Sequence, residues 1–480
     1  MDSGILIGFL GSYVPRFEAM SSTQLPEISD TKPGLRAGIT IATHFVVDVF
    51  SFVGVALLPL FAVLLDLPTE KKALLLALGS FCSGAIQPIV AWASDKFDTR
   101  ALGTLGFVVA VLCIGNLGMA TNFTQFAILY SLGAVGIGAF HPPAAAIVGH
   151  LGGSKRSMMI ALFFLAGMSG GIIGNVFTPR YVEMMTPMVD GQPDTIAGVL
   201  ALRWFIPVGL AFALLLALTI HKVGHRHSSA EHHVSWDAKE RRARWFAVGV
   251  LYFANMVRFS VNMALIYLLV ELAGEITLAQ SEAALSGAQL GVQASRLNGL
   301  FQASMQVGMG SVGIMLGFML SARFEKFAFV VLPILGSFAL FMIPRADMFA
   351  AGAEVPVAII GTILTGIGFG AVIPVSISLA QRLLPHRTSL ASGLMLGGAW
   401  MLAFVGPIFA EIVHKGFASK PGTPEFVLDA IRSLPDSLSA SLLDGFGLDA
   451  GFTATAVALF LAGLISLLLP HKLIVEVAKH

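Results

Sequence analysis

The segment 136–157 reads GIGAFHPPAAAIVGHLGGSKRS, and the segment 366–388 reads GIGFGAVIPVSISLAQRLLPHRT. Both begin with Gly-Ile-Gly, continue with apolar residues and proline, and end in a polar, basic turn. A glycine-rich apolar stretch follows each turn, Gly167–Gly174 in the first case and Gly393–Gly406 in the second. Because the turn residues are polar and keep their order, apolar composition alone does not explain the match. The sequence therefore predicts an internal repeat of two similar halves.

A third match and a polar divider define the boundaries of these halves. Ser94–Asp98 (SDKFD) corresponds to Ser321–Glu325 (SARFE), and it lies in the same order relative to the other matches. A long basic segment in the middle of the chain separates the two copies. The predicted organisation is a cytoplasmic tail 1–36, a six-helix bundle 37–221, a cytoplasmic linker 222–243, a second six-helix bundle 244–475 and a cytoplasmic tail 476–480.

Composition places these halves in a membrane. Of 480 residues, 56% are hydrophobic and only 12% are charged, about half the charged fraction of a soluble protein. The net charge of +1 argues against nucleic-acid binding. Cys82 and Cys113 are the only cysteines, so the chain has no disulfide framework and no cysteine-based metal site. No phosphate-binding loop of the G-x-x-x-x-G-K-[ST] type occurs, which argues against a nucleotide-driven motor.

Stretches of about 20 apolar residues predict transmembrane helices. Twelve such spans lie at 37–66, 72–94, 101–120, 123–149, 156–180, 198–221, 244–271, 295–321, 326–344, 355–383, 388–414 and 451–475. The tails and the connections after even-numbered spans carry more basic than acidic residues, so the positive-inside rule places both termini in the cytoplasm. We predict an all-α polytopic membrane protein with twelve transmembrane helices in two pseudo-symmetric six-helix bundles.

Ionisable residues inside these spans are the first candidates for function. A charge at the centre of a membrane helix costs about 2.5–3.5 kcal/mol on insertion scales, so such residues rarely occur without a role. His44 and Asp48 are four residues apart and share one helix face, which makes them a candidate proton site. His141 is predicted at a similar depth in span 4. The two prolines after it, Pro142 and Pro143, predict a kink.

Arg258 lies near the centre of span 7, and Asn255 and Asn262 flank it on one helix face. Spans 1 and 7 are equivalent in the repeat, and aligning them brings Asp48 within one residue of the position of Arg258. We therefore expect an attraction between Asp48 and Arg258 across a central cavity, with Arg258, His141, Asn255 and Asn262 contacting substrate. The alternative is a permanent ion pair that only holds the halves together.

The remaining polar residues of the spans favour structural roles. Gln302, Gln306, Gln87 and Asn116 are more typical of hydrogen bonds between helices. Five histidines in the central segment, His221, His225, His227, His232 and His233, are interleaved with basic residues and serine, which favours a solvated loop over a metal site. The long external segment between Lys415 and Asp449 is predicted to hold a short helix.

These motifs resemble the major facilitator superfamily of transporters from Arg36 to His471. Asp95 and Lys96, with Arg100, are similar to that superfamily's signature between spans 2 and 3. Within it, the fosmidomycin-resistance branch of drug efflux proteins is most similar, with His-Phe-x-x-Asp at 44–48, Phe-His-Pro at 140–142 and an arginine in span 7.

The resemblance implies a proton-driven antiporter that exports a small organic compound or drug across a bacterial inner membrane by alternating access. Asp48 and His44 would carry the coupling proton, and Arg258 would attract an anionic group of the substrate. Asp95, Lys96 and Arg100 would latch one conformation. Expected partners are substrate, protons and lipid, in a monomer with no cofactor and no enzymatic activity. Two alternatives stay open: a proton-coupled importer of a metabolite, and a non-transporting sensor or assembly factor.

Overall fold

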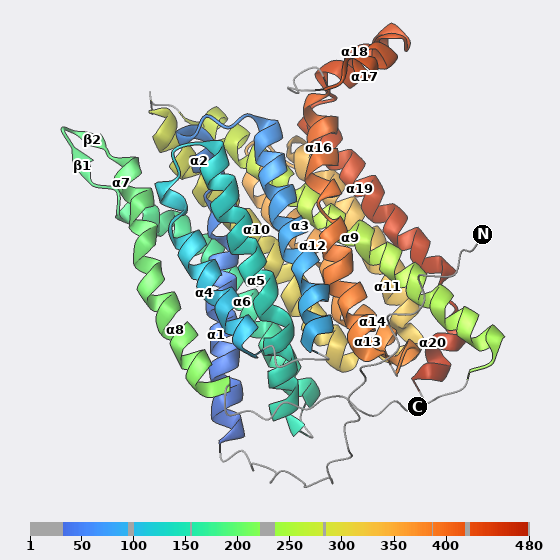
Figure 1. Cartoon of the computed structure of the whole chain (residues 1–480). Helices are drawn as coiled ribbons and strands as arrows, with labels where there is room; N and C mark the ends of the chain where they lie inside the picture. The colour runs from blue at the N-terminus through green and yellow to red at the C-terminus, as the bar shows by residue number, and fades with distance from the viewer. Residues whose placement is uncertain are drawn as a thin grey trace, which may run out of the picture.

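The computed structural model of the chain is a bundle of long, roughly aligned helices (Figure 1). It describes residues 32–94, 100–153, 156–220, 236–281, 285–385, 387–417 and 423–478. We call the end of the bundle that holds the start of α1 and the C-terminal helix α20 the lower end, and the opposite end the upper end, as drawn in Figure 1.

The first half of the chain forms one group of helices. Its elements are α1 (Pro33–Ala56), α2 (Leu58–Leu64), α3 (Thr69–Ser94), α4 (Arg100–Gly115), η1 (Leu117–Met119), α5 (Phe123–Leu151), α6 (Arg156–Met184), α7 (Thr195–Leu200), η3 (Ala201–Trp204) and α8 (Phe205–Ile220). A two-stranded antiparallel hairpin, β1 (Met188–Val189) with β2 (Gln192–Pro193), follows α6 at the upper end. We call this group the first bundle.

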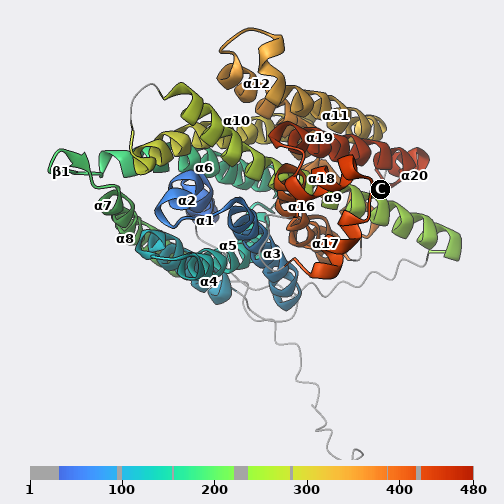
Figure 2. The same cartoon turned by 90° about the horizontal axis from the view of Figure 1, so that it is seen from above.

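The second half forms the second bundle. Its elements are α9 (Ala238–Gln280), α10 (Gly287–Met319), α11 (Ala322–Met342), η4 (Ile343–Met348), α12 (Glu354–Gly370), α13 (Ile373–Leu383), α14 (Thr388–Gly393), the π-helix η5 (Leu394–Gly398), α15 (Ala399–Leu402), α16 (Val405–Lys415), α17 (Glu425–Arg432), α18 (Asp436–Asp444), α19 (Leu448–Ile465), η6 (Ser466–Leu468) and α20 (His471–Val477). Seen from above, the two bundles lie side by side (Figure 2).

The helices agree with the all-α polytopic class predicted from the sequence. Within the described residues, eleven helical segments are long and apolar enough to cross a membrane. The span predicted at 295–321 is also one continuous helix, α10, but it is not among these eleven, and Asn298, Gln302 and Gln306 make it more polar than a typical span. The external segment predicted to hold one short helix holds two, α17 and α18.

Prolines lie in two different settings in these helices. Helix α5 runs from Phe123 to Leu151 as a single element that contains Pro142 and Pro143, and the kink expected there stays a prediction. The predicted span 37–66 is divided at Leu57 into α1 and α2, and Pro59, the second residue of α2, has no N–H with which to continue the hydrogen bonding of α1.

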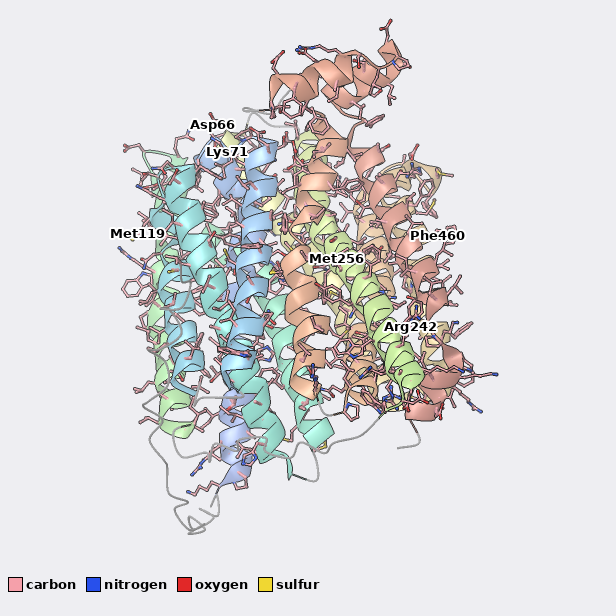
Figure 3. All side chains as sticks on the ribbon, turned by 45° about the vertical axis from the view of Figure 1, so that its right-hand side comes forward. Asp66, Lys71, Met119, Arg242, Met256 and Phe460 are labelled. Atoms are coloured by element: carbon pink, nitrogen blue, oxygen red, sulfur yellow. The ribbon has the colours of Figure 1, made fainter. Side chains whose placement is uncertain are left out.

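The outer faces of the bundle suit lipid. Large apolar side chains such as Leu105, Leu214 and Phe338 are 60% exposed, which a soluble protein would rarely tolerate in such number. Figure 3 places Asp66 and Lys71 at the upper end and Arg242 near the lower end, with Phe460 on the outer side between them. The charged residues labelled there lie toward the ends of the bundle and the apolar Phe460 lies on its side, as expected of a membrane protein.

Glycines bring helices into close contact where the site forms. A Cβ atom at Gly170 or Gly174 would overlap the α1 backbone at Phe45 and Val49, so α6 and α1 pack backbone to backbone. Across the bundle interface, a Cβ at Gly84 of α3 would overlap the backbone of Met401, which lies in α15. These close approaches hold α1 against α6 and the first bundle against the second.

Candidate functional site

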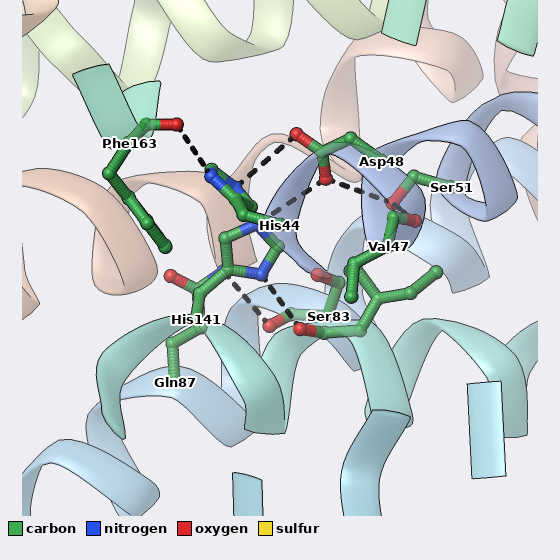
Figure 4. Close-up of polar contacts among 9 residues, drawn as sticks. His44, Val47, Asp48, Ser51, Ser83, Gln87, His141 and Phe163 are labelled. Atoms are coloured by element: carbon green, nitrogen blue, oxygen red, sulfur yellow. Dashed lines mark hydrogen bonds and ion pairs between the residues drawn. The ribbon is translucent and has the colours of Figure 1, made fainter. Parts of the chain in front are cut away.

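Three ionisable side chains meet inside the first bundle, on α1 and α5 (Figure 4). The Nε2 atom of His44 lies 3.5 Å from Asp48 Oδ2, and the Nε2 atom of His141 lies 3.5 Å from Asp48 Oδ1. Ser51 Oγ lies 3.4 Å from Asp48 Oδ1. His44 and Asp48 share a face of α1, as their spacing predicted, and His141 lies against them as its depth predicted. We call these three residues the His–Asp–His cluster.

Backbone carbonyls fix the orientation of both imidazole rings. His44 Nδ1 lies 2.7 Å from the carbonyl oxygen of Phe163 on α6, and His141 Nδ1 lies 2.7 Å from that of Ile137. A carbonyl oxygen can only accept, so each Nδ1 carries a hydrogen. In the neutral rings, both Nε2 lone pairs then face the carboxylate of Asp48. Two acceptors cannot bond to each other, and His44 Nε2 has no hydrogen-bond partner among the described residues.

A cation resolves this conflict between acceptors. One proton on either Nε2, or on the carboxylate, turns a contact between two acceptors into a hydrogen bond. The ligand atoms of the three residues all lie within 4.8 Å of one another, so a single bound cation could contact all of them. The arrangement is chemically suited to binding a positive charge and releasing it again.

The surroundings make one member of the cluster more accessible than the others. The His44 and Asp48 side chains are 3% and 12% exposed, whereas that of His141 is 28% exposed. Phe163 stacks on the His44 ring at 3.7 Å between centroids. A Cβ atom at Gly167 would lie 2.5 Å from both Asp48 Oδ2 and His44 Cε1, so only glycine leaves room for this geometry. His141 is therefore the member of the cluster least enclosed by the protein.

Arg258 does not pair with Asp48, contrary to the expectation from the repeat. Its guanidinium is fully buried inside the second bundle. It donates to Asn255 Oδ1 at 3.0 Å, to the Phe329 carbonyl at 3.0 Å and to Ser466 Oγ at 2.8 Å. The physical reason is rotation: a shift of one residue along a helix turns a side chain by about 100°. Arg258 therefore points toward α11 and η6, whereas Asp48 points toward α5 and α6.

The two asparagines predicted beside Arg258 also bond within the second bundle. Asn255 donates to Ser376 Oγ at 2.8 Å, and Asn262 lies 3.6 Å from the sulfur of Met305. Both side chains are buried. The four residues predicted to contact substrate are therefore divided, with His141 in the cluster and the other three in the second bundle.

The predicted latch between spans 2 and 3 cannot be placed. Asp95 and Lys96 lie outside the described residues, as do the histidines of the central segment. Arg100 begins α4, but its side chain is not among those described. The role predicted for these three residues stays a prediction.

The sequence analysis missed the polar contacts that join the two bundles at the upper end. Lys72 of α3 forms an ion pair with Glu271 of α9 at 2.5 Å, and Arg296 of α10 pairs with Glu183 of α6 at 3.1 Å. Asn298 of α10 donates to the Val55 carbonyl of α1 at 2.9 Å. Opposite charges at the ends of predicted spans were the available signal, but pairing them requires the bundle geometry.

A family model and several solved structures support the fold. The family model described as Major Facilitator Superfamily matches residues 39–407. A comparison with curated proteins finds no match.

Solved structures with the same fold cover nearly the whole chain. One is a bacterial homologue of the human drug peptide transporters PepT1 and PepT2, with 16% identity, a TM-score of 0.62 and coverage of 93% of this chain and 99% of that chain. A bacterial homologue of the human lysosomal transporter Spinster, inward-facing and unoccupied, has 14% identity, a TM-score of 0.64 and coverage of 94% and 99%. The E. coli fucose:proton symporter has 14% identity, a TM-score of 0.56 and coverage of 92% and 99%.

Proposed function

Because this chain belongs to the major facilitator superfamily, we propose that it is a proton-coupled secondary transporter whose coupling proton binds at the His–Asp–His cluster. The observation that supports this most directly is the convergence of two imidazole Nε2 atoms on one carboxylate. Both rings are held by backbone carbonyls in the tautomer that needs an added proton. Such a group buried inside a membrane protein is a typical proton relay.

His141 gives the proton a way in. As the most exposed member it exchanges with water first, and Asp48 then shares the proton with the more enclosed His44. Among the described side chains, α6 places Phe163 and Gly167 against the cluster, and neither carries a charge. The nearest charged or titratable groups on α1 and α5, Arg36 and His150, lie toward the helix ends, and Lys72 of α3 is paired at the upper end. The cluster therefore responds to protons through its own three members.

Alternating access would couple this proton to cargo movement. The ion pairs Lys72–Glu271 and Glu183–Arg296 close the upper end between the bundles, which supports a state that opens at the lower end. With the termini in the cytoplasm, as the distribution of basic residues predicts, that state faces inward. We propose that the membrane is a bacterial inner membrane and that the chain works without a cofactor other than the proton gradient.

We further propose export of a small organic compound in exchange for protons. The residues 44–48 and 140–142 that form the cluster are those that resemble the drug-efflux branch. Import with protons is the second candidate, because similar folds include a protein named a fucose:proton symporter. In both cases, cargo and proton cross the membrane by the same alternating access between the two bundles.

The test is proton movement driven by cargo in everted membrane vesicles that contain a pH-sensitive dye. A panel of neutral, cationic and anionic compounds, including fosmidomycin, is added to vesicles with the parent chain or Asp48→Asn at equal abundance. We expect at least one compound to release protons from energised parent vesicles, and we expect no release in the variant. A chelator is present throughout, so that metal ions cannot be the coupling cation.

Equal proton release by parent and variant would refute the role of Asp48. The side from which the cargo is supplied separates the two directions. Antiport alkalinises the vesicle interior when cargo is added outside, whereas symport out of the vesicle does so only when the cargo has been preloaded. A conservative variant, His141→Gln, keeps a polar side chain but cannot be protonated in the physiological pH range. We expect it to retain transport with a flattened dependence on pH.

A further inference from the structure

Buried polar atoms without a partner gather along the seam between α6 and α10, where the two bundles meet. Within the described part of the chain, these atoms are Asn175 Oδ1, Gln302 Oε1 and both amide atoms of Gln306. Their residues are at most 2% exposed. Native proteins almost always satisfy buried polar groups, so a run of unsatisfied atoms on one seam indicates a place where another molecule completes the bonding.

The two helices pass each other in a single antiparallel register. From the upper end to the lower, the contacts are Glu183 with Arg296, the Asn175 carbonyl with Gly299, Gly171 with Gln306, and Met168 with Gly310. Asn175 and Gln302 therefore lie at the same height, and Gln306 lies one turn closer to the lower end. The ion pair closes the seam above these amides and Met168 closes it below.

Existing hydrogen bonds determine which amide atoms are available. Asn175 Nδ2 donates to the Gly171 carbonyl at 3.0 Å. Gln302 Nε2 donates to the Ile266 carbonyl at 3.2 Å and to Asn298 Oδ1 at 3.1 Å. Because the NH₂ groups must face these oxygens, the unpartnered atoms of both residues are carbonyl oxygens, which only accept. Gln306 adds one further acceptor and one donor.

The charged residues near the seam also favour a bound compound that carries hydrogen-bond donors over one that carries a negative charge. Gly167, one helical turn from Gly171, lies against the carboxylate of Asp48, so an acidic group lies one turn from the glycine that contacts Gln306. Arg258, which was expected to attract an anion, is bonded inside the second bundle. The basic residue of the seam, Arg296, is paired with Glu183 at its upper end.

We propose that the α6–α10 seam is the cargo-binding site and that it takes a compound rich in hydroxyl or amine hydrogen-bond donors, neutral or cationic, rather than an anion. The proposal rests on the chain being a transporter. Asn175 Oδ1, Gln302 Oε1 and the Gln306 amide receive the donors of the cargo when the bundles part at the seam. Because Gly171 and Gly167 lie on the same face of α6, cargo at Gln306 sits about one turn, roughly 6 Å, from the proton cluster.

The test is thermal unfolding of the purified full-length chain with three probes: glucose, spermidine and fosmidomycin. These represent a hydroxyl-rich neutral compound, an amine and an anion. We expect glucose or spermidine to raise the Tm of the parent in a saturable way, and we expect Gln306→Leu and Gln306→Met to lose that shift. The matched control Asn116→Leu removes an amide outside the seam, one that already donates to the Leu112 carbonyl, and it keeps the shift.

The variants without ligand supply a second readout. Gln306 has no partner to lose, so Gln306→Leu leaves the Tm of the free protein unchanged or higher, whereas Asn116→Leu lowers it. The proposal is overturned if neither donor-rich probe shifts the parent, if Gln306→Leu keeps the shift, or if fosmidomycin produces a shift that depends on Gln306. Proton release lost in Asp48→Asn but unaffected by Gln306→Leu would reject the seam and leave the proposed function standing.

Discussion

Asp48 and Arg258 lie near equivalent positions on the first long helix of each bundle, but the protein holds them differently. Asp48 faces two imidazoles at 3.5 Å, longer than a good hydrogen bond, and one of those rings is 28% exposed. Arg258 makes three contacts of 2.8–3.0 Å and is fully buried. A loosely held charge that water can reach is suited to changing its protonation, whereas a tightly bonded one is suited to holding helices together.

The largest expected effects separate these two roles. Arg258→Ala leaves Asn255 Oδ1 and the Phe329 carbonyl without the donor they have now. Each buried group that loses its partner costs about 1–3 kcal/mol, so we expect the variant to be at least about 2 kcal/mol less stable and poorly abundant in the membrane. Asp48→Asn keeps the shape of the side chain, and we expect near-parent stability with transport at background.

Two measurements on each variant are needed, the Tm of the purified protein and transport per molecule. If Arg258→Ala keeps its Tm but loses transport, Arg258 acts on cargo as the sequence suggested, and the structural assignment is wrong. If Asp48→Asn fails to fold, the cluster is structural. The contrast between Asp48 and Arg258 is supported only if Arg258→Ala loses stability and Asp48→Asn loses transport without losing stability.

The helices and the surroundings of Asp48 could be predicted from the sequence. The helices follow from apolar length, because a backbone in lipid must satisfy its own hydrogen bonds. The pairing of His44 with Asp48 follows from their i, i+4 spacing, which fixes a shared face. Even the polar helix α10 lies where a span was predicted.

The direction of Arg258 could not be predicted in the same way. Aligning the two halves leaves an offset of one residue, which is small along the chain but turns the side chain by about 100°. The α6–α10 seam was missed for a related reason. Gln302 and Gln306 were visible as polar residues in a span, but their lack of partners depends on the register between two helices from different bundles.

A glycine pair gives the next prediction. At Gly167 an added methyl group would lie 2.5 Å from Asp48 Oδ2 and His44 Cε1, so Gly167→Ala must displace the cluster. At Gly249, on α9 of the second bundle, a Cβ meets nothing within 4 Å. Misplacing reacting groups by an ångström can be costly, so we expect Gly167→Ala to lower transport at least about tenfold. Gly249→Ala should keep transport and gain about 0.5–1 kcal/mol of stability.

Transport and Tm are again measured together for both glycine variants. Parent-like transport by Gly167→Ala would show that the His–Asp–His cluster works without its present geometry. The loose contacts of Asp48 would then not explain why its role differs from that of Arg258. A loss of transport in Gly249→Ala would indicate that the α9 surface has a role outside the cluster.

The smallest expected effect concerns the contacts that join the bundles, where neither Asp48 nor Arg258 takes part. The Lys72 and Glu271 side chains are 13% and 10% exposed and pair across the upper end, so they favour the state closed there. Lys72→Met removes the pair, and a loss of about 1.4 kcal/mol corresponds to a tenfold shift toward the open state.

The reporter of this shift is Ser295→Cys, because Ser295 Oγ accepts from the Leu60 amide across the interface at 3.1 Å. With Cys82 and Cys113 replaced by alanine, we expect an impermeant thiol reagent to label that cysteine about tenfold faster in Lys72→Met. The charge exchange Lys72→Glu with Glu271→Lys should return labelling to the parent rate, since it restores the attraction with the signs reversed. Fast labelling in the exchanged pair would mean that the lysine acts through packing and not through charge, and the upper closure would then have to depend on other contacts, such as Asn298 with the Val55 carbonyl.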